Sequence, residues 1–244
     1  MTFESTIYAG DCLEWLRGLS DQSADLVWTD PPYNAGKDYG PGIDDSLPWP
    51  EYWAWVDQWL PECVRVARRG GALFLPQRLV REYWNRLPDA EQVVIRKGAF
   101  GSRTGAWRQQ YHVVLTTAKP LGEERNLVEG IRLPGEGYYF SEERPDHPGL
   151  TAQALTAWAI TTLTLPGELV IDPFMGSGTT AIVAERYGRR WAGCELSQRF
   201  VDMAWERIGA ERDKPKLPLA TTGVFDEDTE PEVAQRSLVL GEGA

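Results

Sequence analysis

Apolar residues along this chain show two kinds of spacing. Short apolar runs have the length and composition of buried strands, and between them apolar residues recur at helical spacing, as in Leu13, Leu16 and Leu19. Strands are predicted at residues 6–11, 24–28, 72–75, 92–95, 111–116, 169–171 and 190–194. Helices are predicted around residues 13–19, 49–68, 78–87, 151–165, 179–187 and 200–208.

Because strands and helices alternate throughout, the pattern predicts an α/β fold with an open, mostly parallel sheet and helices on both faces. The chain length of 244 residues suits one large domain with a tail. We expect a single domain over residues 1–212 and an acidic, flexible tail over residues 213–244, where three prolines and acidic side chains replace any periodic pattern.

The segment 29–34, Thr-Asp-Pro-Pro-Tyr-Asn, directly follows the predicted strand at 24–28. Pro31 and Pro32 remove two backbone donors, so neither strand nor helix can continue, and their carbonyls are free to face a ligand. With the Asp30 carboxylate, the Tyr33 ring and the Asn34 carboxamide they make an acceptor-rich pocket that suits a planar base bearing an amino group. Asn34 is also a candidate DNA contact. The alternative, that this segment only ends a strand, stays open at this point.

A second motif follows the strand at 169–171. Its turn carries the candidate cofactor residues Asp172, Phe174, Gly176, Ser177, Gly178, Thr179 and Thr180. Glycines in such a strand–turn–helix unit allow a tight turn and the close approach of a ligand. Glu195 ends the next predicted strand, 19 positions after Gly176, close to the offset at which an acidic residue meets a ribose hydroxyl.

The chemistry of this turn discriminates between cofactors. It lacks the lysine of a nucleotide-binding P-loop, and Asp172 would place a carboxylate where a pyrophosphate should lie. An ammonium or sulfonium ligand would instead favour Asp172. The turn therefore predicts S-adenosylmethionine (SAM), with Glu195 left for its ribose.

The net charge of −11 is unevenly distributed. Residues 76–119 carry 8 basic and 3 acidic side chains and form the one positive block. Within it, the loop at 96–108 interleaves aromatic rings with the cations Arg96, Lys97, Arg103 and Arg108, a composition typical of nucleic-acid contacts but also of ordinary surface hairpins.

The remaining composition narrows the class of protein. No apolar run is long enough to span a membrane and no secretory leader opens the chain, so a cytoplasmic protein is expected. The three cysteines lack ligand-like spacing, which argues against a structural metal. A loop at 35–48, rich in Gly, Pro and Asp, is expected to be mobile and to lie over the pocket, and Trp28 and Trp49 are candidates to line it.

Taken together, the two motifs resemble those of the beta-class DNA amino-methyltransferases, which modify adenine-N6 or cytosine-N4. The resemblance covers residues 5–205 and rests on Asp-Pro-Pro-Tyr at 30–33, on the turn at 172–180, and on their order, catalytic motif first. It implies a Rossmann-like methyltransferase fold and double-stranded DNA as substrate. Asp11 and Cys12 match the opening strand turn of that family, where the aspartate contacts the cofactor adenine.

The resemblance also implies roles for the first motif. The amino hydrogens of a flipped-out base would be accepted by Asp30 and the Pro31 carbonyl, with Pro32 shaping the turn and Tyr33 stacking on the base. An aspartate at position 30 favours adenine-N6 over cytosine-N4. The family also suggests a restriction–modification context, a homodimer, and a small target-recognition region at about 96–147.

There are two departures from the family. The stretch between Lys119 and His147 is short for a target-recognition region. His147 and Pro148 keep the first half of a motif that usually continues to Lys-Pro, and the second half is lost. Rival interpretations therefore remain: an RNA or protein-amide methyltransferase on the same fold, or a non-catalytic DNA-binding relative.

Overall fold

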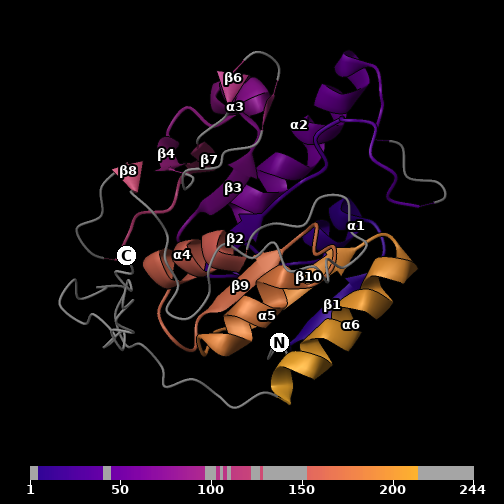
Figure 1. Ribbon diagram of the computed structural model, residues 1–244, viewed down its shortest axis with the longest axis vertical. Helices are drawn as coiled ribbons and strands as arrows, with labels where there is room; N and C mark the ends of the chain where they lie inside the picture. The colour runs from indigo at the N-terminus through magenta and orange to yellow at the C-terminus, as the bar shows by residue number, and fades with distance from the viewer. Residues whose placement is uncertain are drawn as a thin grey trace, which may run out of the picture.

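The structure is a computed structural model that describes residues 5–40, 45–96, 103–104, 107–108, 111–121, 127–128 and 153–213. Its centre is an eight-stranded sheet with the strand order β1-β10-β9-β2-β3-β7-β4-β8 (Figure 1). The strands are β1 (Thr6–Ala9), β2 (Leu26–Thr29), β3 (Gly71–Leu75), β4 (Glu91–Arg96), β7 (Tyr111–Thr116), β8 (Leu127–Val128), β9 (Leu169–Asp172) and β10 (Arg190–Glu195). Strands β5 (Arg103–Thr104) and β6 (Trp107–Arg108) form a separate antiparallel pair.

The sheet is parallel except at β7, which runs antiparallel to both of its neighbours, β3 and β4. The remaining pairs, from β1·β10 to β4·β8, are parallel. The predicted mostly parallel α/β architecture is therefore confirmed.

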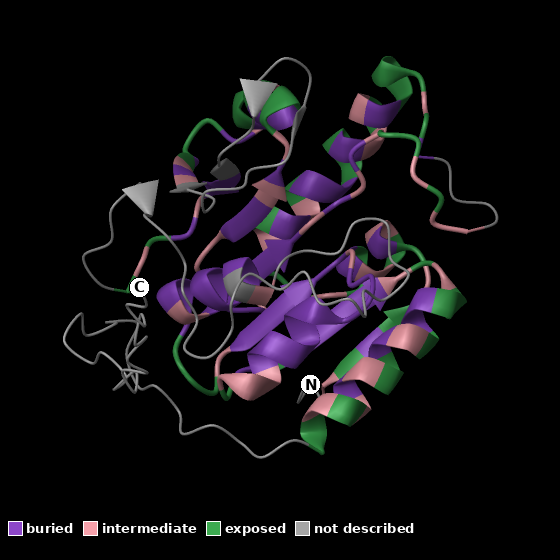
Figure 2. Cartoon of the chain, viewed as in Figure 1, coloured by how far each residue is buried: buried purple, intermediate pink, exposed green. Residues whose placement is uncertain are grey.

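Helices cover both faces of the sheet (Figure 1). One face is packed by α1 (Cys12–Arg17), α2 (Trp49–Val66) and α3 (Gln77–Arg86), and the other by α4 (Gln153–Leu163), α5 (Thr179–Arg186) and α6 (Gln198–Arg212). Side chains of β2 alternate accordingly, since Leu26 and Trp28 join the α4–α6 layer while Val27 joins the α1–α3 layer. Figure 2 shows the resulting buried sheet between partly exposed helices.

The predicted elements are present with small shifts at their ends. The run at 24–28 starts its strand only at Leu26, because Ala24 pairs with Ala67 in an isolated bridge. Helix α2 begins at Trp49 as predicted but ends at Val66, two residues early, and contains Pro61. Within the described residues, none of the helices is both long enough and apolar enough to cross a membrane.

Parallel strands end at one edge of the sheet, which brings distant loops together. The loops that follow β1, β2, β9 and β10 meet there. Between β9 and α5 the chain turns at Gly178, whose φ of 82° lies in the left-handed region. A Cβ at this position would lie 2.9 Å from the Cβ of Ala204 on α6, so glycine allows both the turn and the close packing of α6.

Candidate active site

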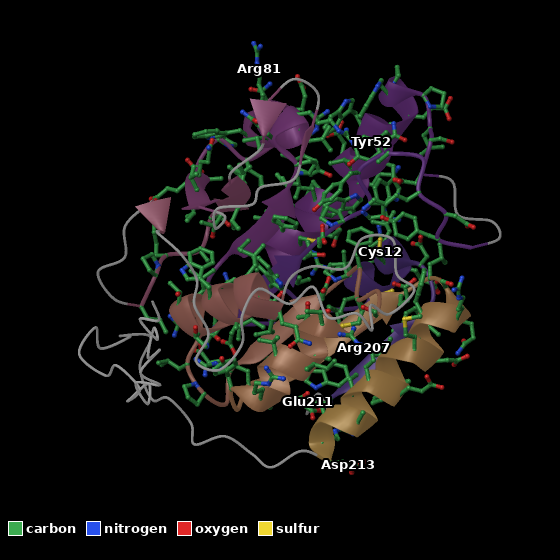
Figure 3. The ribbon with its side chains drawn as sticks, in the orientation of Figure 1. Cys12, Tyr52, Arg81, Arg207, Glu211 and Asp213 are labelled. Atoms are coloured by element: carbon green, nitrogen blue, oxygen red, sulfur yellow. The ribbon has the colours of Figure 1, made fainter. Side chains whose placement is uncertain are left out.

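A cavity of about 120 Å³ lies at this carboxyl edge of the sheet. Its walls come from four loops and from α2. The lining residues are Gly10, Asp11, Cys12, Asp30, Pro32, Tyr33, Tyr39, Trp55, Phe174, Gly176, Glu195 and Leu196. Residues of both sequence motifs, 30–33 and 172–180, therefore line one cavity. In Figure 3 the labelled Cys12 and Tyr52 lie on the adjacent α1 and α2.

Glu195 connects the end of β10 to the glycine turn. Its Oε2 accepts the Gly176 N–H at 2.8 Å and its Oε1 accepts the Ser197 N–H at 2.8 Å. Burial raises the pKa of Glu195, and the two backbone donors partly counteract that rise. Each carboxylate oxygen accepts more than one hydrogen bond, so Glu195 keeps acceptor capacity toward the cavity.

Asp11 performs a structural task and still lines the cavity. Its Oδ1 accepts the N–H groups of Leu13 and Glu14 at 2.9 and 3.0 Å, which caps the N-terminus of α1. The neighbouring Cys12 is buried, and desolvation together with the charge of Asp11 raises its pKa to about 12. The Cys12 thiol is therefore protonated at neutral pH, and all three cysteines are free and buried.

The Tyr33 ring is buried against the first motif. Its hydroxyl contacts the Asp30 carboxylate and donates to the Phe74 carbonyl at 2.6 Å. Desolvation, followed by the charge of Asp30, raises the pKa of Tyr33 well above its usual value of 10.0. The phenol thus stays neutral and ties the motif to the end of β3.

The three carbonyls of Pro31, Pro32 and Tyr33 have different environments. The Pro32 carbonyl accepts the Tyr52 hydroxyl at 3.0 Å, and the Tyr33 carbonyl accepts Arg78 Nη2 at 2.9 Å. The Pro31 carbonyl accepts no hydrogen bond from the residues that the structure describes. This carbonyl is therefore free of donors from the described residues, but Pro31 is buried and is not among the residues that line the cavity.

Asp45 anchors the chain that leaves the motif. This buried carboxylate accepts the backbone N–H groups of Asn34, Ala35 and Lys37 at 2.7 to 3.0 Å. The side-chain amide of Asn34 donates to the Leu47 carbonyl at 2.8 Å. Asn34, proposed from the sequence as a DNA contact, thus acts here as a tether of the loop.

Asp172 lies beneath the cavity and is not among the residues that line it. Its carboxylate accepts the hydroxyls of Thr29 and Thr180 at 2.7 and 2.5 Å and the Phe174 N–H at 3.0 Å. Burial raises its pKa to about 6, although these three donors act in the opposite direction. This differs from the expectation of direct contact with a cationic ligand, because folding turns the side chain inward toward β2.

The rest of the glycine turn is also internal. Ser177 is held by Arg207, whose guanidinium donates to the Ser177 hydroxyl at 2.7 Å. Thr179 and Thr180 are buried, and the Thr179 hydroxyl has no hydrogen-bond partner in the part of the chain that the structure describes. Of the proposed cofactor residues in this turn, Phe174 and Gly176 line the cavity, whereas Ser177, Gly178, Thr179 and Thr180 support it from behind.

Several lining residues escaped sequence analysis. Tyr39 comes from the loop after the first motif and packs edge-on against Phe200, with ring centroids 6.5 Å apart. Trp55 projects from α2 and packs against the Phe174 ring, with ring centroids 5.6 Å apart. The helical spacing of Tyr52, Trp55 and Trp59 was the available signal.

The tryptophans suggested by the sequence do not line the cavity. Trp28 is buried in the layer on the α4–α6 side of the sheet, and Trp49 is 45% exposed beside Arg78. Their proximity in sequence to the first motif was misleading, because alternate residues of β2 point to opposite faces and Trp49 starts a helix.

Part of the predicted DNA-contact loop is outside the described residues. Lys97 is not described, and of Arg96, Arg103 and Arg108 only the backbone is described. Within the described ranges, no group of three or more His, Cys, Asp or Glu side chains could hold a metal ion.

Residues 24–97 and 101–206 match the DNA methylase family, whose members are N6 and N4 methylases. This chain belongs to that family. The match includes both motifs and all strands from β2 onward.

Curated relatives agree with this membership. The Type II methyltransferase M.HpaI of Haemophilus parainfluenzae is 26% identical over 238 residues, which cover 85% of this chain and 75% of the relative. The DNA adenine methyltransferase YhdJ of Escherichia coli (strain K12) is 25% identical, covering 83% and 82%. The Type II methyltransferase M.BamHI of Bacillus amyloliquefaciens is 28% identical over 86% of this chain, which spans only 58% of that relative.

Solved structures share the fold. The M1.HpyAVI–SAM complex superposes with a TM-score of 0.61 at 21% identity, covering 83% of this chain and 98% of that chain. The cytosine-N4-specific PvuII DNA methyltransferase superposes with a TM-score of 0.62 at 20% identity, covering 86% and 92%. The methylase described here therefore has the Rossmann-like fold of these enzymes.

Proposed function

We propose that this methylase transfers a methyl group from SAM to the exocyclic amino group of a base flipped out of double-stranded DNA, with adenine-N6 as the acceptor. The observation that carries the proposal is the common cavity. Asp30, Pro32 and Tyr33 of the first motif line it together with Gly176 and Glu195 from the glycine turn and the end of β10. A methyl donor and an amine acceptor can thus meet without either leaving its own loop.

The donor set at the Gly176 end suits SAM. Glu195 and Asp11 provide carboxylate acceptors for hydroxyl and amino groups, while Phe174 and Leu196 provide apolar walls. Among the described residues that line the cavity there is no lysine or arginine, as expected for a ligand without phosphates. Bound SAM would supply an electrophilic methyl carbon on a sulfonium.

The cavity volume of about 120 Å³ is smaller than that of typical ligand pockets, which enclose roughly 300–1,000 Å³. Tyr39 closes it from the loop that follows the first motif and packs against Phe200 on α6. We infer that Tyr39 shifts when SAM binds. Asp172 supports this end indirectly, since its hydrogen bonds to Thr29 and Thr180 hold β9 and α5 in register with β2.

At the other end the chain activates the acceptor nitrogen. The amino lone pair of a base is delocalised into the ring. Hydrogen bonds from the two amino hydrogens to Asp30 and to the Pro31 carbonyl favour a pyramidal nitrogen whose lone pair is localised. With SAM bound, this nitrogen would take the methyl group, sulfur would keep the electron pair of the broken C–S bond, and the surplus proton would pass to solvent. Positioning and electrostatics supply most of the acceleration.

Tyr33 links this step to base entry. The Tyr33 hydroxyl contacts the Asp30 carboxylate. A base whose amino group reaches Asp30 would take over that contact, and the Tyr33 ring would then serve as a stacking surface. Base flipping is the general route by which enzymes reach such an atom.

The remaining assignments belong to the same proposal. The region at 96–147 contributes target recognition, with the cations Arg96, Lys97, Arg103 and Arg108 as DNA contacts. The protein acts in the cytoplasm and forms a homodimer, with residues 1–212 as the catalytic domain and 213–244 as a tail outside it.

Methyl transfer from radiolabelled SAM to duplex DNA, RNA and protein tests the proposal. We expect label in duplex DNA, and N6-methyladenine after digestion to nucleosides. Asp30→Ala should abolish transfer and leave SAM binding by calorimetry unchanged, with Asp38→Ala in the following loop as the matched control. Label in RNA or protein only, or full activity of Asp30→Ala, would refute it. Detection of N4-methylcytosine in place of N6-methyladenine would change only the assigned acceptor base.

A further inference from the structure

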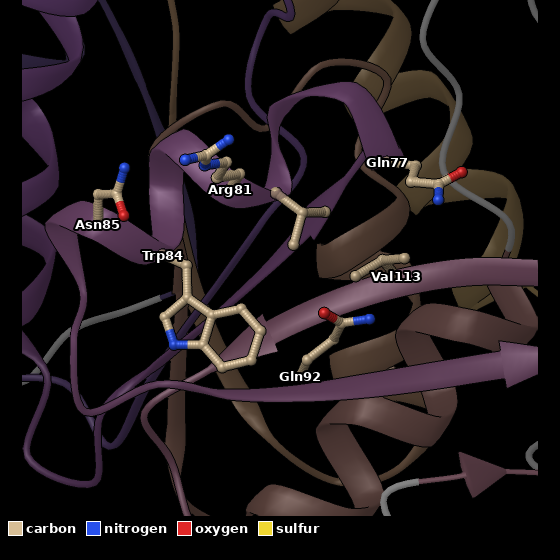
Figure 4. Close-up of a pocket in the computed structure, with 7 residues that line it drawn as sticks. Gln77, Arg81, Trp84, Asn85, Gln92 and Val113 are labelled. Atoms are coloured by element: carbon tan, nitrogen blue, oxygen red, sulfur yellow. The ribbon is translucent and has the colours of Figure 1, made fainter.

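Helix α3 has two chemically different sides. Its inner side packs Leu79 and Tyr83 into the layer beneath the sheet, where both are buried. Its outer side borders a hollow of about 400 Å³ between α3 and the strands β4 and β7 (Figure 4). The residues that line this hollow, which we call the α3 groove, are Gln77, Val80, Arg81, Trp84, Asn85, Gln92 and Val113.

Arg81 is an exposed cation in this groove. The described residues give it no acidic partner, whereas Arg86, one turn further along α3, pairs with Asp57 and Glu82. Figure 3 shows Arg81 projecting away from the body of the molecule. Among neighbouring charges, the helix itself carries three arginines and a single glutamate, in a chain with a net charge of −11.

Trp84 supplies an aromatic surface next to this cation. Its side chain is 39% exposed, and in Figure 4 it lies over the strands on the same side as Gln92. The amides of Gln77, Asn85 and Gln92 both donate and accept hydrogen bonds. A guanidinium for phosphate, an indole for a base or sugar, and amides for polar edges are the groups that bind a nucleotide chain.

The position of the groove connects it to the methylase site. Helix α3 starts just after β3, at the edge where the first motif lies, and Arg78 in its first turn donates to the Tyr33 carbonyl at 2.9 Å. From there α3 leads away from the site over roughly 15 Å. A DNA strand that leaves the cavity along α3 would pass Gln77, Arg81 and Trp84 in that order.

We propose that the α3 groove binds DNA flanking the target base, with Arg81 on a phosphate and Trp84 packed against the adjoining nucleotide. This inference rests on the proposed function, because it takes DNA as the substrate. It adds a contact outside the cavity that strengthens binding to long duplexes without reading their sequence.

Fluorescence anisotropy with a labelled mixed-sequence duplex several helical turns long, over a series of salt concentrations, tests the proposal in the full chain. Each phosphate contact contributes roughly one unit to the slope of log affinity against log salt. Arg81→Ala should therefore lower the slope by roughly one unit. Arg17→Ala, which removes an exposed cation from α1, should leave it unchanged. Trp84→Ala should weaken binding roughly fivefold, and Trp84→Phe should restore most of it.

The outcomes separate the groove from the proposed function. If Arg81→Ala and Trp84→Ala bind the duplex as Arg17→Ala does while the wild-type protein methylates DNA, the groove inference alone fails. If the wild-type protein methylates no DNA but the slope still depends on Arg81, the proposed function fails and the groove stands. Should Trp84→Ala dissociate a dimer in sedimentation and leave the salt slope intact, the groove is an interface between copies and the inference is overturned.

Discussion

Thr29 and Asp172 are separated by 143 positions in sequence and joined by a hydrogen bond of 2.7 Å between Oγ1 and Oδ1. Thr29 is the last residue of β2 before the first motif, and Asp172 is the last residue of β9 before the glycine turn. Both side chains are buried. This bond therefore fixes the two motif-bearing loops relative to one another from below the cavity.

Removing the hydroxyl from this pair should loosen both loops. Thr29→Val keeps the shape of the side chain and removes only its hydroxyl. The Phe174 N–H is then the remaining donor to Asp172 Oδ1. A hydrogen bond to a charged group is worth about 1.5–3 kcal/mol, so the free energy of unfolding should fall by about that amount in urea titrations. Thr161→Val on α4, whose hydroxyl bonds only within its own helix, is the control and should cost less. Equal losses in the two variants would contradict the role assigned to the pair.

Asp172 should make stability depend on pH. Its pKa is raised from 3.8 to about 6 in the folded protein, so between those values the folded state binds more protons than the unfolded state. Stability from this group is therefore present below pH 4 and is lost as the pH rises through 6. Asp172→Asn removes that dependence. Its stability relative to wild type should increase by on the order of 3 kcal/mol from pH 4 to pH 7, measured by urea unfolding. A constant difference would refute the raised pKa.

Tyr52 should act as a positioning residue for the first motif. Its hydroxyl bonds to the Pro32 carbonyl at 3.0 Å and to the Tyr83 hydroxyl at 2.9 Å. Tyr52→Phe should lower kcat for methyl transfer roughly fivefold, the equivalent of one hydrogen bond, and leave the KM for SAM unchanged. Tyr8→Phe, at an exposed tyrosine on β1, controls for loss of a phenol. An unchanged kcat, or an equal rise in KM, would argue that Tyr52 is structural only.

Asp45 should hold the chain after the first motif. Its carboxylate accepts three backbone N–H groups and is 5% exposed, whereas Asp38 in the same loop accepts the Gly40 N–H and is exposed. Asp45→Ala should increase hydrogen exchange at Asn34, Ala35 and Lys37 at least roughly tenfold, because losing the carboxylate that accepts their N–H groups costs more than about 1 kcal/mol. Asp38→Ala should leave exchange there unchanged. Comparable exchange in both variants would show that Asp45 does not anchor the loop.

Glu195 should determine the affinity for SAM. Glu195→Ala removes an acceptor from the cavity and leaves the N–H groups of Gly176 and Ser197 without their carboxylate. We expect the Kd for SAM by calorimetry to rise at least roughly tenfold. Glu206→Ala, an exposed position on α6, is the control. SAM binding that survives Glu195→Ala would place the ribose elsewhere.

Much of this fold could be predicted from the local sequence pattern. The lengths and composition of the apolar runs predicted each strand from β1 to β4 and from β7 to β10 except β8. For β2, β3 and β9 the reason is that burial on both faces demands continuous apolar residues in a parallel strand. The two motifs were recognised for a similar reason. Prolines 31 and 32 restrict the backbone, and the glycines at 176 and 178 allow it unusual conformations. These effects do not depend on the surrounding residues, so they can be predicted from the sequence alone.

Features that depend on the order of strands in the sheet could not be predicted from the local sequence pattern. Periodicity reports whether a residue is buried, but it does not report which strand lies beside it. The inward turn of Asp172 depends on β9 pairing with β2, which brings Thr29 within reach. The hydrogen bonds to the Pro32 and Tyr33 carbonyls likewise depend on Tyr52 and Arg78 arriving from α2 and α3. Contacts of this kind join residues tens of positions apart, and only the folded chain brings their donors and acceptors together.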